Sequence, residues 1–208
     1  MKLKYILAAG AILFSCTAAA QTSAGIKAYN SSPSIQRTST HGIFAPNAEE
    51  VKRDRRAAER GDASAQFKMA LRYDAGRGVP QDYVKSVEWL RKAADQGFVK
   101  AEYNLGCTYE SGQGVSQNHA EAAKWFRKAA EHGYASAQKN LGAMYGKGQG
   151  VPQNSIEAYV WSSIAAISGD EGALNNRELA ARDLSTEDLE IAQKRVAELV
   201  ENIQQRRG

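Results

Sequence analysis

A segment of 36 residues occurs three times in succession, and its copies at 65–100, 101–136 and 137–172 align without a gap. A period of this length is typical of solenoids, in which each unit buries its apolar face against the next unit. Ten positions carry the same residue in all three copies. They are Ala65/Ala101/Ala137, Tyr73/Tyr109/Tyr145, Gly76/Gly112/Gly148, Gly78/Gly114/Gly150, Val79/Val115/Val151, Gln81/Gln117/Gln153, Trp89/Trp125/Trp161, Ala93/Ala129/Ala165, Ala94/Ala130/Ala166 and Gly97/Gly133/Gly169.

The spacing within each copy predicts a pair of antiparallel helices, which we name the A helix and the B helix. Ala65, Met69 and Tyr73 lie four residues apart and form the apolar stripe of the first A helix. Gly76 ends that helix, because a chain that reverses there needs a positive φ angle. Trp89 belongs to the buried stripe of the B helix. Each B helix begins after a residue whose side chain can accept a bond from a free N–H group: Asp82, Asn118 and Asn154.

The pattern A-x-x-x-L-G-x-x-Y-x-x-G-x-G-V-x-x-[DN]-x-x-x-A-x-x-W-x-x-x-A-A-x-x-G resembles the Sel1-like repeat, a relative of the tetratricopeptide repeat. The copy that begins Ala101-Glu-Tyr-Asn-Leu105-Gly106-Cys-Thr-Tyr109 matches this pattern best. The resemblance implies an all-α fold, namely an α/α superhelix or short α-solenoid of antiparallel helix pairs. The resemblance specifies the fold closely but says little about the ligand. By analogy with tetratricopeptide repeats, the A helices should line the concave groove.

Capping helices are expected at both ends, so that one domain covers 47–208. A lone B helix is expected at 48–60, because Arg56-Ala57-Ala58-Glu59-Arg60-Gly61 matches Lys92-Ala93-Ala94-Asp95-Gln96-Gly97. A C-terminal cap is expected at 173–203. Its first part, 173–182, stands in the place of a fourth A helix, and its second helix begins after the N-cap Ser185. Such caps cover the ends of a solenoid with polar residues.

The N-terminal capping helix carries the basic run Lys52-Arg53-Asp54-Arg55-Arg56. Glu49, Glu50 and Glu59 lie on the same helix and balance this charge. The expected role is therefore a solvated face of the cap, with contact to an acidic partner as the alternative.

The first twenty residues are typical of a signal peptide. A basic start with Lys2 and Lys4 precedes an apolar run, and Ala18-Ala19-Ala20 offers a cleavage site before Gln21. The periplasm is the expected destination. In the alternative, Leu13-Phe14-Ser15-Cys16 is a lipobox and the protein is a membrane-anchored lipoprotein through Cys16. Residues 21–46 are rich in small polar residues and are expected to be a flexible linker.

The composition argues against several classes of function. The net charge of the 208 residues is +4, and it falls to +2 once Lys2 and Lys4 leave with the signal peptide, so no nucleic-acid partner is expected. Three histidines and two cysteines are too few for a rich metal site, and we expect no metal and no cofactor. Cys107 is expected to be a half-buried thiol, with an intermolecular disulfide as the alternative.

The best binding candidates lie on the A helices, outside the apolar stripe. The first row of these positions holds Lys68, Asn104 and Asn140, and the second row holds Arg72, Thr108 and Met144. Asparagine both donates and accepts hydrogen bonds, which suits the backbone of an extended peptide. Lys68 and Arg72 could pair with a carboxylate of that peptide. Local hydrogen bonding within the repeat is the alternative role for the asparagines.

Ser136-Ala-Gln-Lys139 matches the S-x-x-K motif of penicillin-recognising enzymes, but the chain has no accompanying S-D-N or K-T-G motif. We therefore expect an exported, non-catalytic scaffold that binds a protein or peptide partner in its groove. The first alternative is a lipid-anchored factor that assembles or regulates an envelope machine. The second is a hydrolase of β-lactams or peptidoglycan that uses Ser136.

Overall fold

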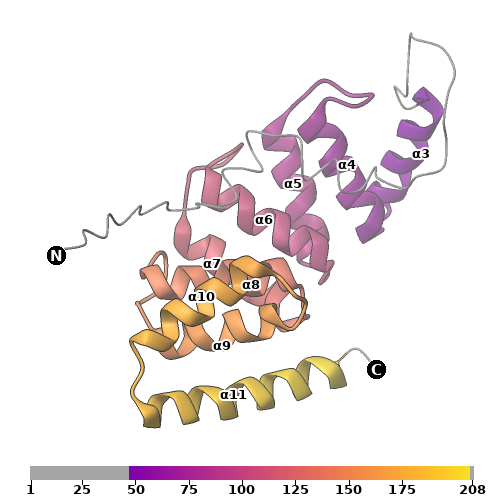
Figure 1. Ribbon diagram of the computed structural model, residues 1–208. Helices are drawn as coiled ribbons and strands as arrows, with labels where there is room; N and C mark the ends of the chain where they lie inside the picture. The colour runs from indigo at the N-terminus through magenta and orange to yellow at the C-terminus, as the bar shows by residue number, and fades with distance from the viewer. Residues whose placement is uncertain (1–46, 207–208) are drawn as a thin grey trace, which may run out of the picture.

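The computed structural model describes residues 47–206, which fold into nine α-helices and contain no strand (Figure 1). The predicted signal peptide, 1–20, and the predicted linker, 21–46, lie outside the described residues. The all-α prediction is confirmed. The helices are α3 (Ala48–Glu59), α4 (Ala63–Ala75), α5 (Tyr83–Ala94), α6 (Val99–Ser111), α7 (His119–Glu131), α8 (Ala135–Lys147), α9 (Ser155–Ala166), α10 (Glu171–Arg182) and α11 (Thr186–Gln205).

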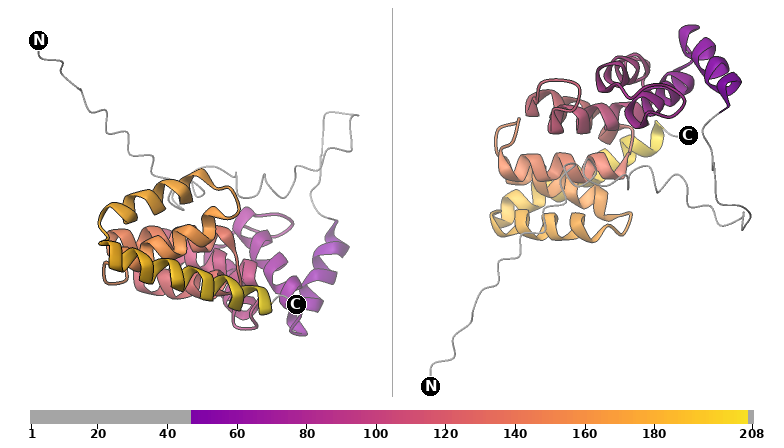
Figure 2. Two further views of the ribbon diagram at one scale, coloured as in Figure 1. Left: turned by 60° about the horizontal axis from the view of Figure 1, so that its bottom comes forward. Right: turned by 90° about the horizontal axis from the view of Figure 1, so that it is seen from above.

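The helices pair as the repeat predicts. The A helices α4, α6 and α8 pack against the B helices α5, α7 and α9, and each of these B helices also packs against the next A helix. Figures 1 and 2 show the pairs stacked one after another, with α3 at one end and α10 and α11 at the other. This arrangement is the predicted α-solenoid.

Two glycines show why the turn after each A helix has its sequence. Gly112 ends α6 with a φ angle of 76°, and its N–H donates to the carbonyl of Thr108. Gly114 has a different role, because a Cβ atom there would lie 2.5 Å from the carbonyl oxygen of Tyr83, at the start of the preceding B helix. The turn of one repeat thus fits closely against the repeat before it.

The predicted caps of the B helices are confirmed. The side chain of Asp82 accepts from the N–H of Lys85, and those of Asn118 and Asn154 accept from the residues at the corresponding positions, at 2.9 to 3.1 Å. The N-cap of α11 is confirmed as well, since Ser185 accepts from the N–H of Asp188.

An arginine of each of the first three B helices donates a hydrogen bond to a tyrosine of the next A helix. Arg91 reaches the hydroxyl of Tyr109 at 2.5 Å, and Arg127 makes the same bond to Tyr145. At the N-terminal end, Arg55 lies 3.5 Å from the hydroxyl of Tyr73. Because these arginines and these tyrosines each recur every 36 residues, the same bond joins each of these B helices to the following A helix.

The C-terminal helix α11 does not take the place of a fourth B helix. It packs against α9, and α10 packs against α8 and α9. Three helices therefore cover α9, which explains why Ser162-Ser163-Ile164 replaces the basic residues of the other B helices. An ion pair of 2.9 Å between Arg195 and Glu157 joins α11 to α9. No helix between residues 47 and 206 is long and apolar enough to span a membrane.

Candidate partner-binding surface

Each A helix has a continuous side that faces away from its buried stripe. In α6, Lys100, Asn104, Cys107 and Ser111 lie on this side, opposite the buried Leu105. Since the repeats share one register, the same positions of the other A helices extend the surface. We call it the outer A face, and its exposed or half-buried residues are Ser64, Lys68, Leu71, Ala75, Lys100, Asn104, Cys107, Ser111, Ser136, Asn140, Ala143, Lys147, Gly172, Asn176 and Leu179.

A polar row runs along the outer A face. It holds Asn104, Asn140 and Asn176, which are half-buried and 36 residues apart, and it begins with the exposed Lys68. Asn104 donates one of its amide N–H groups to the carbonyl of Lys100 at 2.7 Å. Asn176 was not among the predicted residues, although the period of 36 residues continued beyond Asn140 leads to it.

An apolar row lies three residues further along each A helix. It consists of Leu71, Cys107, Ala143 and Leu179, of which Leu179 has 57% of its surface exposed. Cys107 forms no disulfide among residues 47–206. Polar and apolar rows side by side can contact both the backbone and the side chains of an extended segment.

The second predicted row lies beside the outer A face. Arg72 points toward α3, where its Nη2 atom lies 2.6 Å from Asp54 Oδ2 and 2.9 Å from Glu50 Oε1. Thr108 is half-buried and donates to the carbonyl of Asn104 at 2.9 Å. Met144 is 2% exposed and belongs to the core. Of the six predicted residues, the structure therefore gathers Lys68, Asn104 and Asn140 on one surface.

The lysine of the motif Ser136-Ala-Gln-Lys139 forms an ion pair with an acidic residue at the start of the next A helix. Lys139 Nζ lies 2.7 Å from Asp170 Oδ2. Burial alone would raise the pKa of Asp170, but the hydrogen bonds from Lys139 and from the N–H of Ala173 outweigh it, and the pKa of this carboxyl is lowered. The lysine of the S-x-x-K motif is therefore engaged with the N-cap residue of α10.

The two histidines within residues 47–206 have hydrogen-bonding partners in the fold. His132 Nδ1 lies 2.9 Å from Glu102 Oε2, and the ring of His119 lies within hydrogen-bond distance of Gln149 Nε2. Residues 47–206 contain no group of three or more His, Cys, Asp and Glu side chains that could hold a metal ion.

Comparisons with known proteins agree with this geometry. Residues 63–98, 99–134 and 135–170 each match the model of the Sel1 repeat. A Sel1 repeat protein from Oxalobacter formigenes has a similar structure, with 36% identity and a TM-score of 0.56 over 64% of this chain and 60% of that chain. A protective antigen of uropathogenic Escherichia coli strains, which displays the same kind of repeat fold, has 28% identity and a TM-score of 0.57 over 74% of this chain and 41% of that chain. The present chain thus spans less than two thirds of either relative. No curated protein matches it.

Proposed function

Since this chain belongs to the Sel1 repeat family, we propose that it is an exported, non-catalytic scaffold that holds a protein or peptide partner against its outer A face. Sel1 repeat proteins are generally non-catalytic and typically mediate protein–protein interactions. The observation that carries the proposal is the polar row, in which successive A helices place asparagines at the same position.

The chemistry of the outer A face suits an extended segment. A carboxamide offers two N–H donors and an acceptor oxygen, which match the carbonyl and N–H groups of a peptide backbone. The apolar row beside it, from Leu71 to Leu179, can receive alternate side chains of the same segment. Lys68 at the N-terminal end of the polar row can pair with a carboxylate. The partner is therefore expected to be extended, with an acidic group or a free carboxyl terminus at one end.

Export rests on residues 1–20, and the mode of attachment rests on Cys16. A second candidate function, a lipid-anchored factor for envelope assembly or regulation, is favoured by Leu13-Phe14-Ser15-Cys16. The intact mass of the N-terminus after expression in a Gram-negative host tests both candidates. A chain that begins at Gln21 supports the periplasmic scaffold, an acylated Cys16 supports the anchored factor, and an uncleaved Met1 contradicts export.

Site-specific photocrosslinking in that host tests the outer A face. A photoreactive phenylalanine analogue is placed at Leu71 or Ala143 on this face, and at Val84 as a control. Val84 lies on α5 and is 58% exposed. The expected result is one discrete adduct from the first two positions that is missing from the third. Equal adducts at all three positions, or none at any position, would contradict the proposed surface.

The role of the asparagines is tested with the partner identified from that adduct. The triple change Asn104→Ala, Asn140→Ala and Asn176→Ala is expected to weaken binding at least tenfold, because each lost hydrogen bond contributes about 0.5–1.5 kcal/mol. Lys124→Ala on α7 is the matched control, since Lys124 is exposed and lies on a B helix. If the triple variant binds as well as the control, the asparagines act only within the repeat.

A further inference from the structure

Within residues 47–206, the helices at the two ends of the solenoid are unmatched. In this part of the chain α3 comes first and stands in the register of a B helix, with no A helix before it. At the other end, α10 stands in the register of an A helix but has no B helix of its own, because α11 packs against α9. Helix α3 therefore lacks an A helix as its neighbour, and α10, at the other end, is a helix in the A register. In the same way, α10 lacks a B helix, and α3 is a helix in the B register.

The exposed side of α3 is more basic than its sequence suggests. Asp54 points inward to Arg72, and Glu50 pairs with the same guanidinium group. The stripe that faces solvent, opposite the buried Val51 and Ala58, consists of four exposed residues. We call it the α3 stripe, and its members are Glu49, Arg53, Arg56 and Arg60. Within residues 47–206, only Glu49 of these four has an ion pair, with Lys52.

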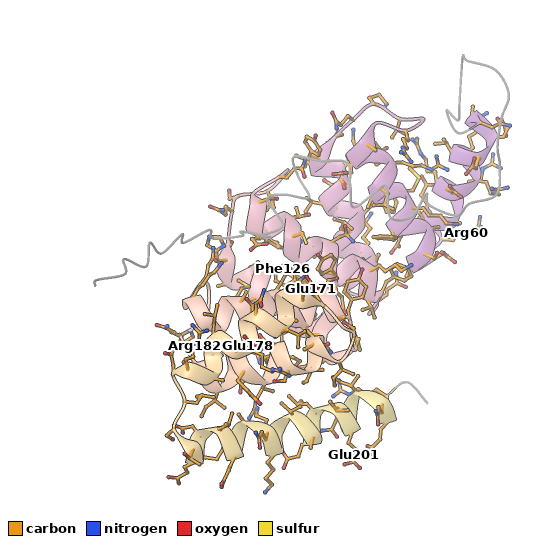
Figure 3. All side chains as sticks on the ribbon, in the orientation of Figure 1. Arg60, Phe126, Glu171, Glu178, Arg182 and Glu201 are labelled. Carbon is orange, nitrogen blue, oxygen red and sulfur yellow. The ribbon has the colours of Figure 1, made fainter. Side chains whose placement is uncertain are left out.

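The exposed side of α10 carries a second stripe with acidic character. At the position where α6 and α8 have Gly106 and Gly142, α10 has the exposed Glu178. These glycines face the B helix of their own repeat, since a Cβ atom at Gly106 would lie 2.6 Å from the ring of Phe126. The α10 stripe consists of Glu171, Asn175, Glu178 and Arg182, all of them exposed, and Figure 3 labels its three charged residues along the helix.

The charges of the α3 stripe and the α10 stripe are complementary when the two helices are antiparallel. Both have successive spacings of four, three and four residues, so each follows one side of its helix. An antiparallel pairing sets Glu171 against Arg60, Glu178 against Arg53 and Arg182 against Glu49, while Asn175 meets Arg56. Three of the four positions thus bring together opposite charges, and none brings together like charges.

The native repeat supports the same direction and nearly the same register. The A and B helices of the second repeat are antiparallel, and Glu102 of α6 contacts His132 of α7. Two repeats after Glu102, the residue at the same position is Leu174 in α10. Two repeats before His132, it is Arg60 in α3. The register of a complete repeat would thus set Arg60 against Leu174, whereas the paired stripes set it against Glu171. The two registers differ by less than one helical turn.

We propose that a second copy of the chain supplies the missing helix, with α10 of one copy docked antiparallel against α3 of the next. In one copy, α3 and α10 lie at opposite ends of the solenoid, so the contact must be between molecules (Figure 1). Such a contact is heterologous and leaves an unpaired end on each side, so association continues into longer assemblies. Because exposed ion pairs are weak and screened by salt, association is modest and occurs at low ionic strength. This inference is independent of the outer A face.

Sedimentation velocity of the full-length chain tests the proposal. At an ionic strength of about 0.01 M, where charges interact over roughly 30 Å, the average mass is expected to rise with concentration. At about 1 M, where this distance falls to roughly 3 Å, the chain is expected to be monomeric. A monomer at every concentration in low salt would overturn the proposal.

Charge reversal identifies the faces. The double variants Glu171→Lys/Glu178→Lys and Arg53→Glu/Arg60→Glu are each expected to stay monomeric, whereas an equimolar mixture of the two is expected to associate as the unaltered chain does. Glu187→Lys/Glu190→Lys on α11 is the matched control, because it changes the charge equally at exposed positions away from both stripes. Equal loss of association in the control, or no recovery in the mixture, would overturn the proposed pairing. Melting curves establish that all variants are folded.

Discussion

Arg72 and Asp54 form an ion pair that is almost completely buried between α4 and α3. The Nη2 and Nε atoms of Arg72 lie 2.6 Å and 3.1 Å from Asp54 Oδ2, and the two side chains are 11% and 10% exposed. The same guanidinium reaches Glu50, whose side chain is 46% exposed. The N-terminal capping helix is thus joined to the first repeat by a charged contact as well as by apolar packing.

Removing the buried partner should loosen this cap. Asp54→Ala is expected to lower the free energy of unfolding by about 3 kcal/mol, because it leaves the Arg72 guanidinium buried beside one half-exposed carboxylate. Glu50→Gln removes the exposed partner and is expected to cost less than about 1 kcal/mol. Urea unfolding measures both values. Equal losses would show that burial does not govern the strength of the pair.

Two glycines in A helices should respond in opposite ways to alanine. A Cβ atom at Gly106 would lie 2.6 Å from the ring of Phe126, which is fully buried and has little room to move. Gly106→Ala is therefore expected to destabilise the fold by about 1–3 kcal/mol. At Gly146 the nearest side-chain atom would be 3.8 Å away, so Gly146→Ala is expected to stabilise α8 by about 0.5–1 kcal/mol. Thermal unfolding of the two variants gives the signs. If Gly106→Ala stabilised the fold, α6 and α7 would be able to move apart at no cost in free energy.

Replacing Glu102 with glutamine should stabilise the second repeat. Gln66 and Gln138, at the same position of the other repeats, donate to the carbonyls of Ala58 and Ala130 at 3.1 Å and 3.0 Å. Glu102 is 2% exposed, and its carboxyl group has no N–H to donate to the corresponding carbonyl. Glu102→Gln is expected to add about 1 kcal/mol to the free energy of unfolding at neutral pH.

The reverse change is the control for this prediction. Gln138→Glu should destabilise the third repeat, since it removes a donor from a buried site. If Glu102→Gln instead destabilises the chain, the pair between Glu102 and His132 is worth more than the hydrogen bond that glutamine restores.

Asp170 should contribute stability that acid removes. Its side chain caps α10 by accepting from the N–H of Ala173 at 2.9 Å, and it pairs with Lys139. Asp170→Ala loses both contacts and is expected to cost about 1 kcal/mol, whereas Asp170→Asn keeps a capping acceptor and is expected to cost less.

The pH dependence follows from the lowered pKa of Asp170. A group whose pKa is lower in the folded state stabilises the fold above its unfolded pKa, here about 3.9, and loses this contribution as the pH falls through the folded pKa. The difference in stability between the unaltered chain and Asp170→Asn is therefore expected to be constant at neutral pH and to vanish in acid. Unfolding measured as a function of pH checks this, and a difference that grows in acid would contradict it.

Local rules account for what the sequence predicts well. The glycine turns and the N-caps depend on residues a few positions apart, so the three helix pairs follow from the repeat itself. The packing of α11 does not follow from the repeat. The apolar side of this helix shows that it packs against the fold, but it does not show which helix it contacts. The clue lay in α9, where Ser162-Ser163-Ile164 replaces basic residues and thereby indicates a helix that gains further cover.

The candidate surface was predictable in part for the same reason. Lys68, Asn104 and Asn140 lie on the outer A face because their register places them opposite the buried stripe. Arg72 differs, since its position depends on Asp54, 18 residues earlier, which turns the guanidinium inward. A residue type alone does not show whether a charge serves a partner or the fold.

Within residues 47–206 the core consists of two unequal clusters, so the N-terminal end of the solenoid is expected to be less stable than the C-terminal end. The smaller cluster lies beneath α3 and contains Val51, Ala58, Ala65, Met69 and Val79, whereas the larger one extends from Ala70 to Ile203. Helix α11, which packs against α9, contributes Ala192 and Ile203 to the larger cluster. Unravelling should therefore start at α3 and move toward the C-terminus, so that the amide protons of α3 exchange with solvent long before those of α9.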